Sequence, residues 1–425
     1  MRATPIAIIH QVLTLLMVNG QTTHRVIEET TRLAHALGLD IQMVPQWEGM
    51  ACRIRPIEPE NRAVATGSTE LIVVRPVGID MNKVARTLDC VQTICQDPSR
   101  LDQTNLERSS QALNTIAELP PSSNLRFILM AGFGAAALGL IFGVTEPVTL
   151  MLIWLAAAAG ALVRRLVSRC SSNLYVQPLI AAWIAGLSGG LAERLLDIQG
   201  LQFVVIAPCM ILVPGAHILN GSLDLVRGRL GLGVHRMVYS AMILMAICTG
   251  LLLGIAMTDG TLSSSIPLSD TPLWLDILCA GIAVCAFGAF FSLPWGVVAI
   301  PMAIGMLAHG SRWWILDLGG GLVLGALVAC VIAGTLHTFL ARRLKLPFAA
   351  LAFASVVSLM PGIFVFRFAD GLITIYTQGA STTLATLSQT ASDGTAAMLI
   401  VLAMTLGLII PKMLIEGLWL RDTSK

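Results

Sequence analysis

Two stretches decide how this sequence is interpreted: ILVPGAHILNGSLD at residues 211–224 and LMPGIFVFRFAD at residues 359–370. Both place a Pro-Gly pair within an apolar run and follow it with polar side chains. Asn220 and Arg367 each lie six residues after their proline. Proline removes a backbone hydrogen bond and glycine loosens a helix, so each pair predicts an interrupted helix.

The composition around these stretches is that of a membrane protein. Of the 425 residues, 55% are hydrophobic and 12% charged, whereas a soluble domain is about 25% charged. Residues 1–125 carry 24 charged side chains, but residues 126–425 carry only 28. This excludes an ordinary soluble enzyme. The net charge of +2, without a basic stripe interleaved with aromatics, gives no reason to expect a nucleic-acid partner.

Ten apolar stretches follow the charged N-terminal part and predict ten transmembrane helices. They cover residues 127–143, 147–163, 174–192, 201–223, 237–257, 272–291, 294–309, 315–340, 347–375 and 396–418.

The loops between these stretches predict the orientation. With the N-terminal part inside, the inner loops hold Arg164, Arg165, Arg169, Arg227, Arg229, Arg236, Arg342, Arg343 and Lys345. The outer loops hold Arg194 and Arg312, and the 258–271 loop holds Asp259 and Asp270 without a basic residue. The positive-inside rule therefore places both termini in the cytoplasm of a multi-pass inner (plasma) membrane protein.

Ten spans divide into five and five, each half containing one Pro-Gly pair. Since five is odd, the second half must cross the membrane in the opposite sense, which predicts an inverted repeat. We expect a cytoplasmic domain at 1–121 and two five-helix repeats at 122–258 and 259–425. Interrupted helices at matching positions mark a binding site in such folds. The candidate substrate and proton-pathway residues are Pro214, Gly215, Asn220, Asp224, Pro361, Gly362, Arg367 and Asp370.

Different roles are expected for the charged candidates. Asp224 is the expected carrier of a coupling proton, and the alternative is a helix-end carboxylate that pairs with Arg227 at i,i+3. Arg367 is expected to bind a substrate carboxylate or to pair with Asp370. The alternative for Arg367 and Asp370 is an internal ion pair without a transport role.

The N-terminal part predicts a small α+β domain. A helix pair ends near Gly38, and short β-type runs follow at 41–44, 51–54 and 71–74. Two helices, at 80–96 and 102–118, each begin with an aspartate suited to capping. Residues 120–123, Pro-Pro-Ser-Ser, form a linker.

A polar motif of Thr23, His24, Arg25 and Glu28 lies on the second predicted helix. His24 and Glu28 at i,i+4 suit a metal or acid–base pair, but no third ligand accompanies them. Arg25 and Glu28 at i,i+3 suit a stabilising helix pair. We favour a solvated or interdomain polar face. The nine cysteines are scattered without a C-x-x-C pair, so neither a metal nor a cofactor is expected.

These residues make the sequence resemble the threonine/serine exporter family. GQTTHRVIE at residues 20–28 is similar to the family pattern G-x-x-T-x-R-V-E, with Ile27 as a departure. The two Pro-Gly segments carry the rest of the resemblance. It implies a cytoplasmic domain before ten spans and export of small amino acids driven by the proton motive force. Some relatives divide this architecture between two polypeptides and are associated with dicarboxylate export.

The resulting hypothesis is a secondary active transporter that exports threonine or serine by proton antiport, in which the N-terminal domain gates or assembles the transporter. Its expected partners are the small substrate, protons and the lipid bilayer, and a homo-oligomer is compatible with it. The alternatives are a dicarboxylate (succinate-like) exporter, or a membrane channel or enzyme regulated by the soluble domain. No nucleotide-binding loop or nucleophile elbow is present in the sequence, so neither an ATP-driven pump nor an enzyme is expected.

Overall fold

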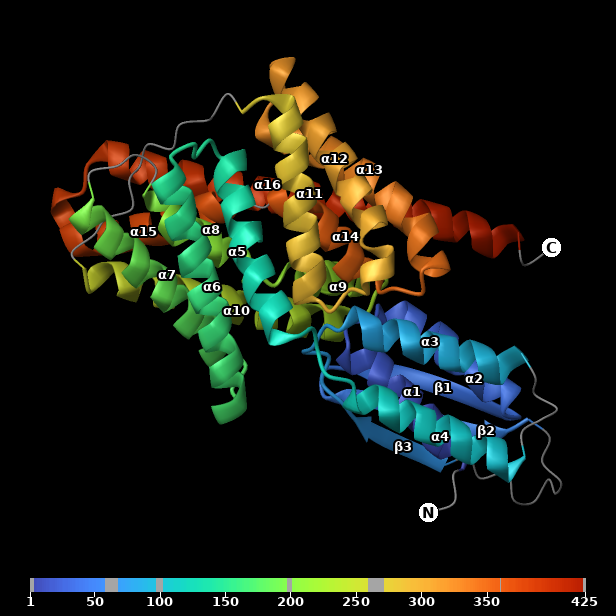
Figure 1. Ribbon diagram of the computed structural model, residues 1–425. Helices are drawn as coiled ribbons and strands as arrows, with labels where there is room; N and C mark the ends of the chain where they lie inside the picture. Colours follow the sequence, from blue (N-terminus) through green and yellow to red (C-terminus); the bar gives the residue numbers. More distant parts are fainter. Residues whose placement is uncertain are drawn as a thin grey trace.

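The computed structural model describes residues 4–57, 68–96, 102–196, 201–258, 271–359 and 361–422. Figure 1 shows a small domain with a sheet, drawn in blue, below a large bundle of helices. The buried apolar side chains form one cluster within residues 8–116 and a second cluster dominated by residues 135–409. The acidic 258–271 loop, with Asp259 and Asp270, lies almost entirely outside the described residues.

The N-terminal domain has the predicted mixed composition and order. Its elements are α1 (Pro5–Val18), α2 (Thr23–Ala36), β1 (Leu39–Gln46), β2 (Gly49–Pro56), β3 (Ser68–Val73), α3 (Met81–Gln96) and α4 (Gln103–Glu118). Both predicted aspartate caps form, since Asp80 accepts from the Lys83 amide and Asp102 from the Asn105 amide. Helix α1 is apolar but only 14 residues long, and its buried side chains belong to the core of this domain.

The sheet is antiparallel in the order β1-β2-β3 and alternates between two faces. Ile41, Cys52 and Ile54 are buried under the helices, whereas Val44 and Leu71 are exposed. One face therefore packs on the helices of the domain, and the other is open.

Twelve α-helices follow the domain within the described residues. They are α5 (Asn124–Ile141), α6 (Pro147–Cys170), α7 (Val176–Leu195), α8 (Gln202–Met210), α9 (Gly215–Val226), α10 (Leu230–Ala256), α11 (Leu273–Phe290), α12 (Ala299–Asp317), α13 (Leu322–Arg343), α14 (Phe348–Val356), α15 (Gly362–Gln378) and α16 (Leu384–Asp422).

Six helices of the described part are long and apolar enough to cross a membrane: α5, α6, α10, α11, α13 and α16. Both predicted interruptions are present as bent pairs. Helices α8 and α9 meet at 47°, and α14, extended to Leu359, meets α15 at 70°. Counting each pair as one span gives up to eight. Helices α7 and α12 occupy the third and seventh predicted stretches but are not among these eight, so the chain is a polytopic helical protein of six to eight candidate spans.

Most of the predicted loop arginines lie within helices instead: Arg164, Arg165, Arg169, Arg194, Arg236, Arg312, Arg342 and Arg343. Helix α10 begins at Leu230, so Arg236 belongs to its second turn and is 1% exposed. Helix α12 extends to Asp317 and includes Arg312. Arginine raises the average polarity at a helix end, which makes the sequence signal resemble a loop. In α10 the Asp224 carboxylate pairs with Arg236, which allows the helix to include this arginine.

Helices α5 and α11 lie side by side in opposite directions (Figure 1). Near the N-terminal domain, the rings of Phe127 and Phe290 stack with centroids 5.3 Å apart. At the other end, the Thr271 hydroxyl donates to the Leu140 carbonyl at 3.3 Å. One helix therefore leads away from the domain and the other returns to it.

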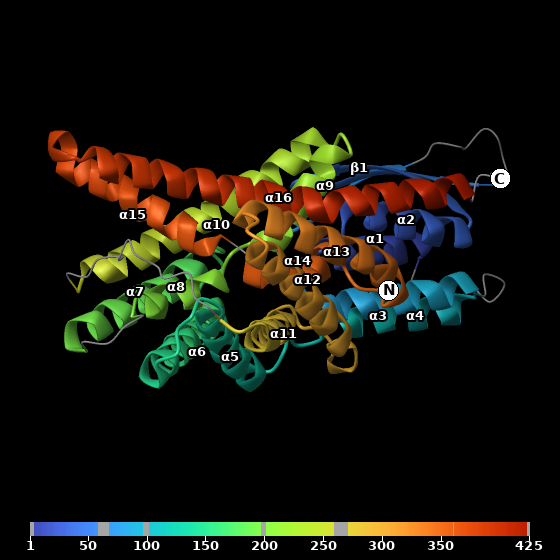
Figure 2. The same ribbon diagram turned by 90° about the horizontal axis from the view of Figure 1, so that it is seen from above.

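The helix contacts of the two halves repeat. Helix α7 packs on α10 as α13 packs on α16, and α9 packs on α10 as α15 packs on α16. Figure 2 shows α16 running along the molecule beside α15 and α13. Small residues bring the paired backbones close together: a Cβ on Gly250 would collide with the Leu179 carbonyl, and one on Gly334 would lie 2.9 Å from the Gly407 carbonyl.

Candidate functional site

The turn between α1 and α2 packs against the first interrupted helix. Gly20 has φ +85°, a conformation that favours glycine, and its carbonyl accepts a 3.2 Å hydrogen bond from the Asn220 side chain. The Thr23 hydroxyl donates to Asp224 Oδ2 at 2.9 Å. Two predicted regions, distant in sequence, therefore form one contact between the domain and the bundle.

We call Thr23, Asp224, Arg229 and Arg236 the Asp224 cluster. Arg236 Nε lies 3.2 Å from Asp224 Oδ2, and Arg229 Nη1 lies 3.4 Å from Asp224 Oδ1. Asp224 is 2% exposed, so both guanidinium groups neutralise a carboxylate that has little access to water. A proton would have to compete with them for this carboxylate. The i,i+3 pairing of Asp224 with Arg227 does not form, since Arg227 pairs with Glu416 of α16.

His24 faces this second ion pair. Glu416 also accepts a hydrogen bond from Lys412 Nζ at 2.6 Å, which makes a small charged group where α2, α9 and α16 meet. Burial and the nearby Arg227 guanidinium lower the pKa of His24 to about 4. His24 is therefore neutral at physiological pH in the folded protein.

Arg25 and Glu28 form the expected helix pair, with Arg25 Nη1 lying 3.0 Å from Glu28 Oε2. Glu28 also lies 3.3 Å from Arg342 Nη2 of α13, and Lys345 pairs with Asp89 of α3. The motif thus faces the bundle, as an interdomain polar face would. The described residues contain no group of three or more His, Cys, Asp or Glu side chains that could hold a metal.

A cavity of about 250 Å³, the first cavity, lies beside the first break. Pro214 and His217 line it from the bundle, and Val77 and Ile79 line it from the N-terminal domain. Its other lining residues include Arg164, Arg165, Gln177, Tyr239, Phe290 and Ser292. The N-terminal domain therefore forms part of the wall of this cavity.

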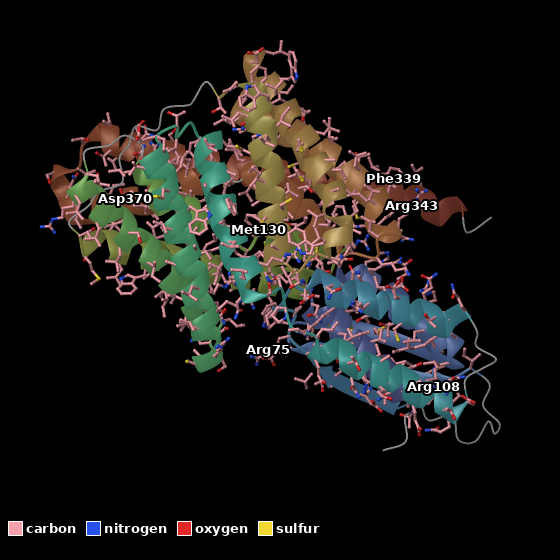
Figure 3. The ribbon with its side chains drawn as sticks, viewed as in Figure 1. Arg75, Arg108, Met130, Phe339, Arg343 and Asp370 are labelled. Atoms are coloured by element: carbon pink, nitrogen blue, oxygen red, sulfur yellow. The ribbon has the colours of Figure 1, made fainter. Side chains whose placement is uncertain are left out.

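The second break pairs Arg367 with a residue that the sequence did not suggest. Arg367 Nη2 lies 3.1 Å from Asp393 Oδ2 of α16, and the Gln389 amide donates to the same carboxylate. The expected pairing of Arg367 with Asp370 is not found. Asp370 is half-buried in α15, with no hydrogen bond or ion pair to any of the residues described, and it lies at the left-hand end of the bundle in Figure 3.

A second cavity, of about 190 Å³, lies beside this break. Pro361 and Arg367 line it, together with Asp276 of α11 and Arg312 of α12. Asp276 Oδ2 lies 2.7 Å from His309 Nδ1, and both side chains are almost fully buried. The far end of α5, at Ile141, also lines this cavity, which places it at the end of α5 away from the N-terminal domain.

Sequence reasoning missed the partners that Asp224, Arg367 and Arg227 have in the structure, which are Arg236, Asp393 and Glu416. It also missed Asp276, His309 and Arg312 at the second cavity. Each is an ionisable residue within or at the end of an apolar stretch, and such residues are functional candidates in membrane proteins by default. Asp276 and Arg312 were overlooked because they lie near predicted helix ends, where a charge looks solvated.

Two family models match the chain over most of its length. The model ThrE, described as "Putative threonine/serine exporter", matches residues 8–258, and ThrE_2, described as "Threonine/Serine exporter, ThrE", matches residues 276–414. No solved structure matches the chain. The first match alone includes the N-terminal domain, the Asp224 cluster and the first break, and the second includes the other break and Arg367. The chain therefore belongs to the threonine/serine exporter family and carries both family regions in one polypeptide.

Proposed function

We propose that the chain exports threonine and serine across the plasma membrane in exchange for protons. The observation that carries this proposal is a pair of cavities, one at each Pro-Gly break, which lie at opposite ends of the helix bundle. Interrupted helices expose backbone groups where they line a cavity, and secondary transporters bind their substrates at such places.

The transport domain is proposed to be a ten-span inverted repeat. The contacts among α5–α10 recur among α11–α16, which supports the division into two equivalent halves. The cavities support it too, since the end of α11 at Phe290 lines the first and the end of α5 at Ile141 lines the second. Helices α7 and α12 complete ten spans if each bent pair counts once.

The N-terminal domain is proposed to lie in the cytoplasm and to gate the first cavity. Val77 and Ile79 lie on its wall, and the Asp224 cluster fastens the domain to the helix that follows the break. We assign Asp224 this fastening role rather than proton transfer, because two arginines already neutralise its charge.

A dicarboxylate is the second candidate substrate. Two guanidinium groups, Arg312 and Arg367, line the second cavity, and arginine binds carboxylates through paired hydrogen bonds. An amino acid and a dicarboxylate both present such a carboxylate, so the choice between them needs a direct comparison.

Transport by the purified full-length protein in proteoliposomes tests the function. Labelled threonine should show saturable counterflow, and an imposed pH gradient should drive its accumulation until a protonophore collapses the gradient. Recovered threonine should be chemically unchanged. Flux that never saturates would indicate a channel, an altered product an enzyme, and preferential movement of succinate a dicarboxylate exporter.

A further inference from the structure

The charged groups around the second cavity are not equivalent. The Arg367 guanidinium is already paired with Asp393, which is 4% exposed. Arg312 also lines the cavity, but its guanidinium makes no hydrogen bond or ion pair with any residue that the structure describes. The Asp276 carboxylate attracts Arg312 without a direct contact, so the hydrogen-bond donors of this guanidinium remain open to a ligand.

A carboxylate lines the same cavity. Asp276 is 3% exposed, and its Oδ2 atom is held by His309 Nδ1 at 2.7 Å. His309 is itself 1% exposed, and its Nε2 atom has no hydrogen-bond partner within the described parts of the chain. The contact with His309 fixes the orientation of the carboxylate and leaves Oδ1 without a partner among these residues.

We propose that the second cavity binds a small α-amino acid as a zwitterion, with Arg312 as the carboxylate-binding residue and Asp276 as the ammonium-binding residue. The inference rests on the exporter function proposed above and names the residues that bind its substrate. Arg312 donates paired hydrogen bonds to the substrate carboxylate. Asp276 accepts from the substrate ammonium, and His309 is the positioning residue that orients Asp276.

This arrangement explains why both charges are tolerated in an apolar bundle. A charge with little access to water is unfavourable without hydrogen-bond partners. A zwitterion supplies an acceptor for Arg312 and a donor for the Asp276 carboxylate, which His309 contacts only through Oδ2. The rest of the wall is mostly apolar and includes Trp313, Phe364, Leu322 and Ile363, which suits the side chain of a small amino acid. A dicarboxylate would leave Asp276 facing a second negative charge, so the site disfavours it.

Competition against labelled threonine on the purified protein in nanodiscs tests the two contacts separately. Threoninol lacks the carboxylate, and N-acetylthreonine lacks the ammonium. Each should compete at least about tenfold less well than threonine, because each loses a charge-assisted contact. Succinate should also compete poorly. Equal competition by threonine and either analogue, or stronger competition by succinate, would overturn the proposal.

Variants then assign each contact to its residue. Arg312→Gln should weaken threonine binding and abolish the discrimination against threoninol, while Arg312→Lys restores part of it. Asp276→Asn should abolish the discrimination against N-acetylthreonine and leave that against threoninol. Arg194→Gln and Asp317→Asn change exposed charges at the ends of α7 and α12 and serve as matched controls. Size-exclusion profiles identify any variant that misfolds, and the analogue competition on the unmodified protein still decides the proposal.

The experiments distinguish a wrong assignment of this binding site from a wrong assignment of the exporter function. If the unmodified protein transports threonine and both variants keep its affinity and its discrimination between analogues, the site is wrong and the function stands. If the protein binds threonine with the expected discrimination but never transports it, the site stands and the function is wrong.

Discussion

The Thr23 hydroxyl donates a 2.9 Å hydrogen bond to Asp224, although 201 residues separate the two in the sequence. Arg236 contacts both side chains, with Nη2 lying 3.4 Å from the Thr23 hydroxyl and Nε lying 3.2 Å from the Asp224 carboxylate. All three residues are at most 4% exposed. The N-terminal domain is therefore attached to the first break through a buried polar contact.

Removal of either partner should weaken the attachment of the domain. Thr23→Val keeps the shape of the side chain but loses the hydroxyl, which should cost about 1 kcal/mol. Asp224→Asn leaves Arg236 buried beside a neutral group and should cost about 3–5 kcal/mol. Faster proteolysis of the 119–123 linker measures the loss, and Thr31→Val on the same helix is the control. If Asp224→Asn instead leaves linker proteolysis and substrate exchange unchanged but abolishes gradient-driven export, Asp224 is the proton carrier.

Attachment of the domain should weaken in acid through His24. Its pKa is about 4 in the folded protein, below the ordinary value of about 6.5. Well above pH 6.5 the imidazole is neutral in both the attached and the detached states and contributes nothing. As the pH falls from 6.5 to 4, the detached state binds a proton that the attached state excludes, so stability is lost and then levels off.

The variant His24→Gln isolates this effect. Arg227 and Arg229 disfavour the charged imidazole, whereas Glu28 and Glu416 favour it. Because carboxylates also bind protons in acid, they add to the pH dependence of the stability of the unmodified protein. The difference in melting temperature between the unmodified protein and His24→Gln should therefore change between pH 6.5 and 4 and stay constant above. Thr31→Val on the same helix provides the control, because it removes no titratable group. A constant difference across the whole range would contradict the role of His24.

The two aspartates near the second break should respond differently to neutralisation. Asp393→Asn leaves the Arg367 guanidinium unpaired in the bundle and should cost about 3–5 kcal/mol. Asp370→Asn removes a half-buried carboxylate without a described partner and should change stability by no more than about 0.5 kcal/mol. Melting temperatures in detergent measure both. A larger loss for Asp370→Asn would restore the pairing of Arg367 with Asp370 that the sequence suggested.

Thiol labelling of intact cells tests the proposed topology. In a background without the native cysteines, Thr145→Cys, exposed between α5 and α6, should react with a membrane-impermeant reagent. Arg343→Cys, exposed at the end of α13 (Figure 3), should react only after the membrane is permeabilised. Labelling of Arg343→Cys in intact cells would contradict the inverted repeat, because it places the inner end of the second half outside.

The local features of the fold could be predicted because they depend on neighbours in the sequence. Asp80 and Asp102 cap their helices as expected, the β-type runs became strands, and both Pro-Gly pairs interrupt a helix. Helix boundaries were less accurate where an arginine has a partner from another element. Arg236 looked like a loop residue because nothing in the sequence reveals that Asp224 and Thr23 enclose it.

The partners of the candidate residues could not be predicted for a related reason. A sequence indicates which residue types occur at i,i+3, and this suggested Asp224 with Arg227 and Arg367 with Asp370. The partners in the structure are Arg236 for Asp224 and Asp393 for Arg367. Which partner is in reach depends on how each helix is rotated about its axis within the bundle. Helical spacing permits both arrangements, and only the tertiary packing selects one of them.

The close backbone contact at Gly250 and at Gly334 limits how this protein can change shape. Helices in contact along their backbones have no layer of adaptable side chains between them, so they slide or separate only with large losses of contact. We therefore expect the helix pairs α7–α10 and α13–α16 to move as two rigid units. We therefore expect bending at Pro214 and Pro361 to be the easiest deformation, because each proline already interrupts a helix. A methyl group added at Gly250 should disturb the packing of α7 on α10, whereas a substitution of Pro214 or Pro361 should alter the angle between the two helices that meet there.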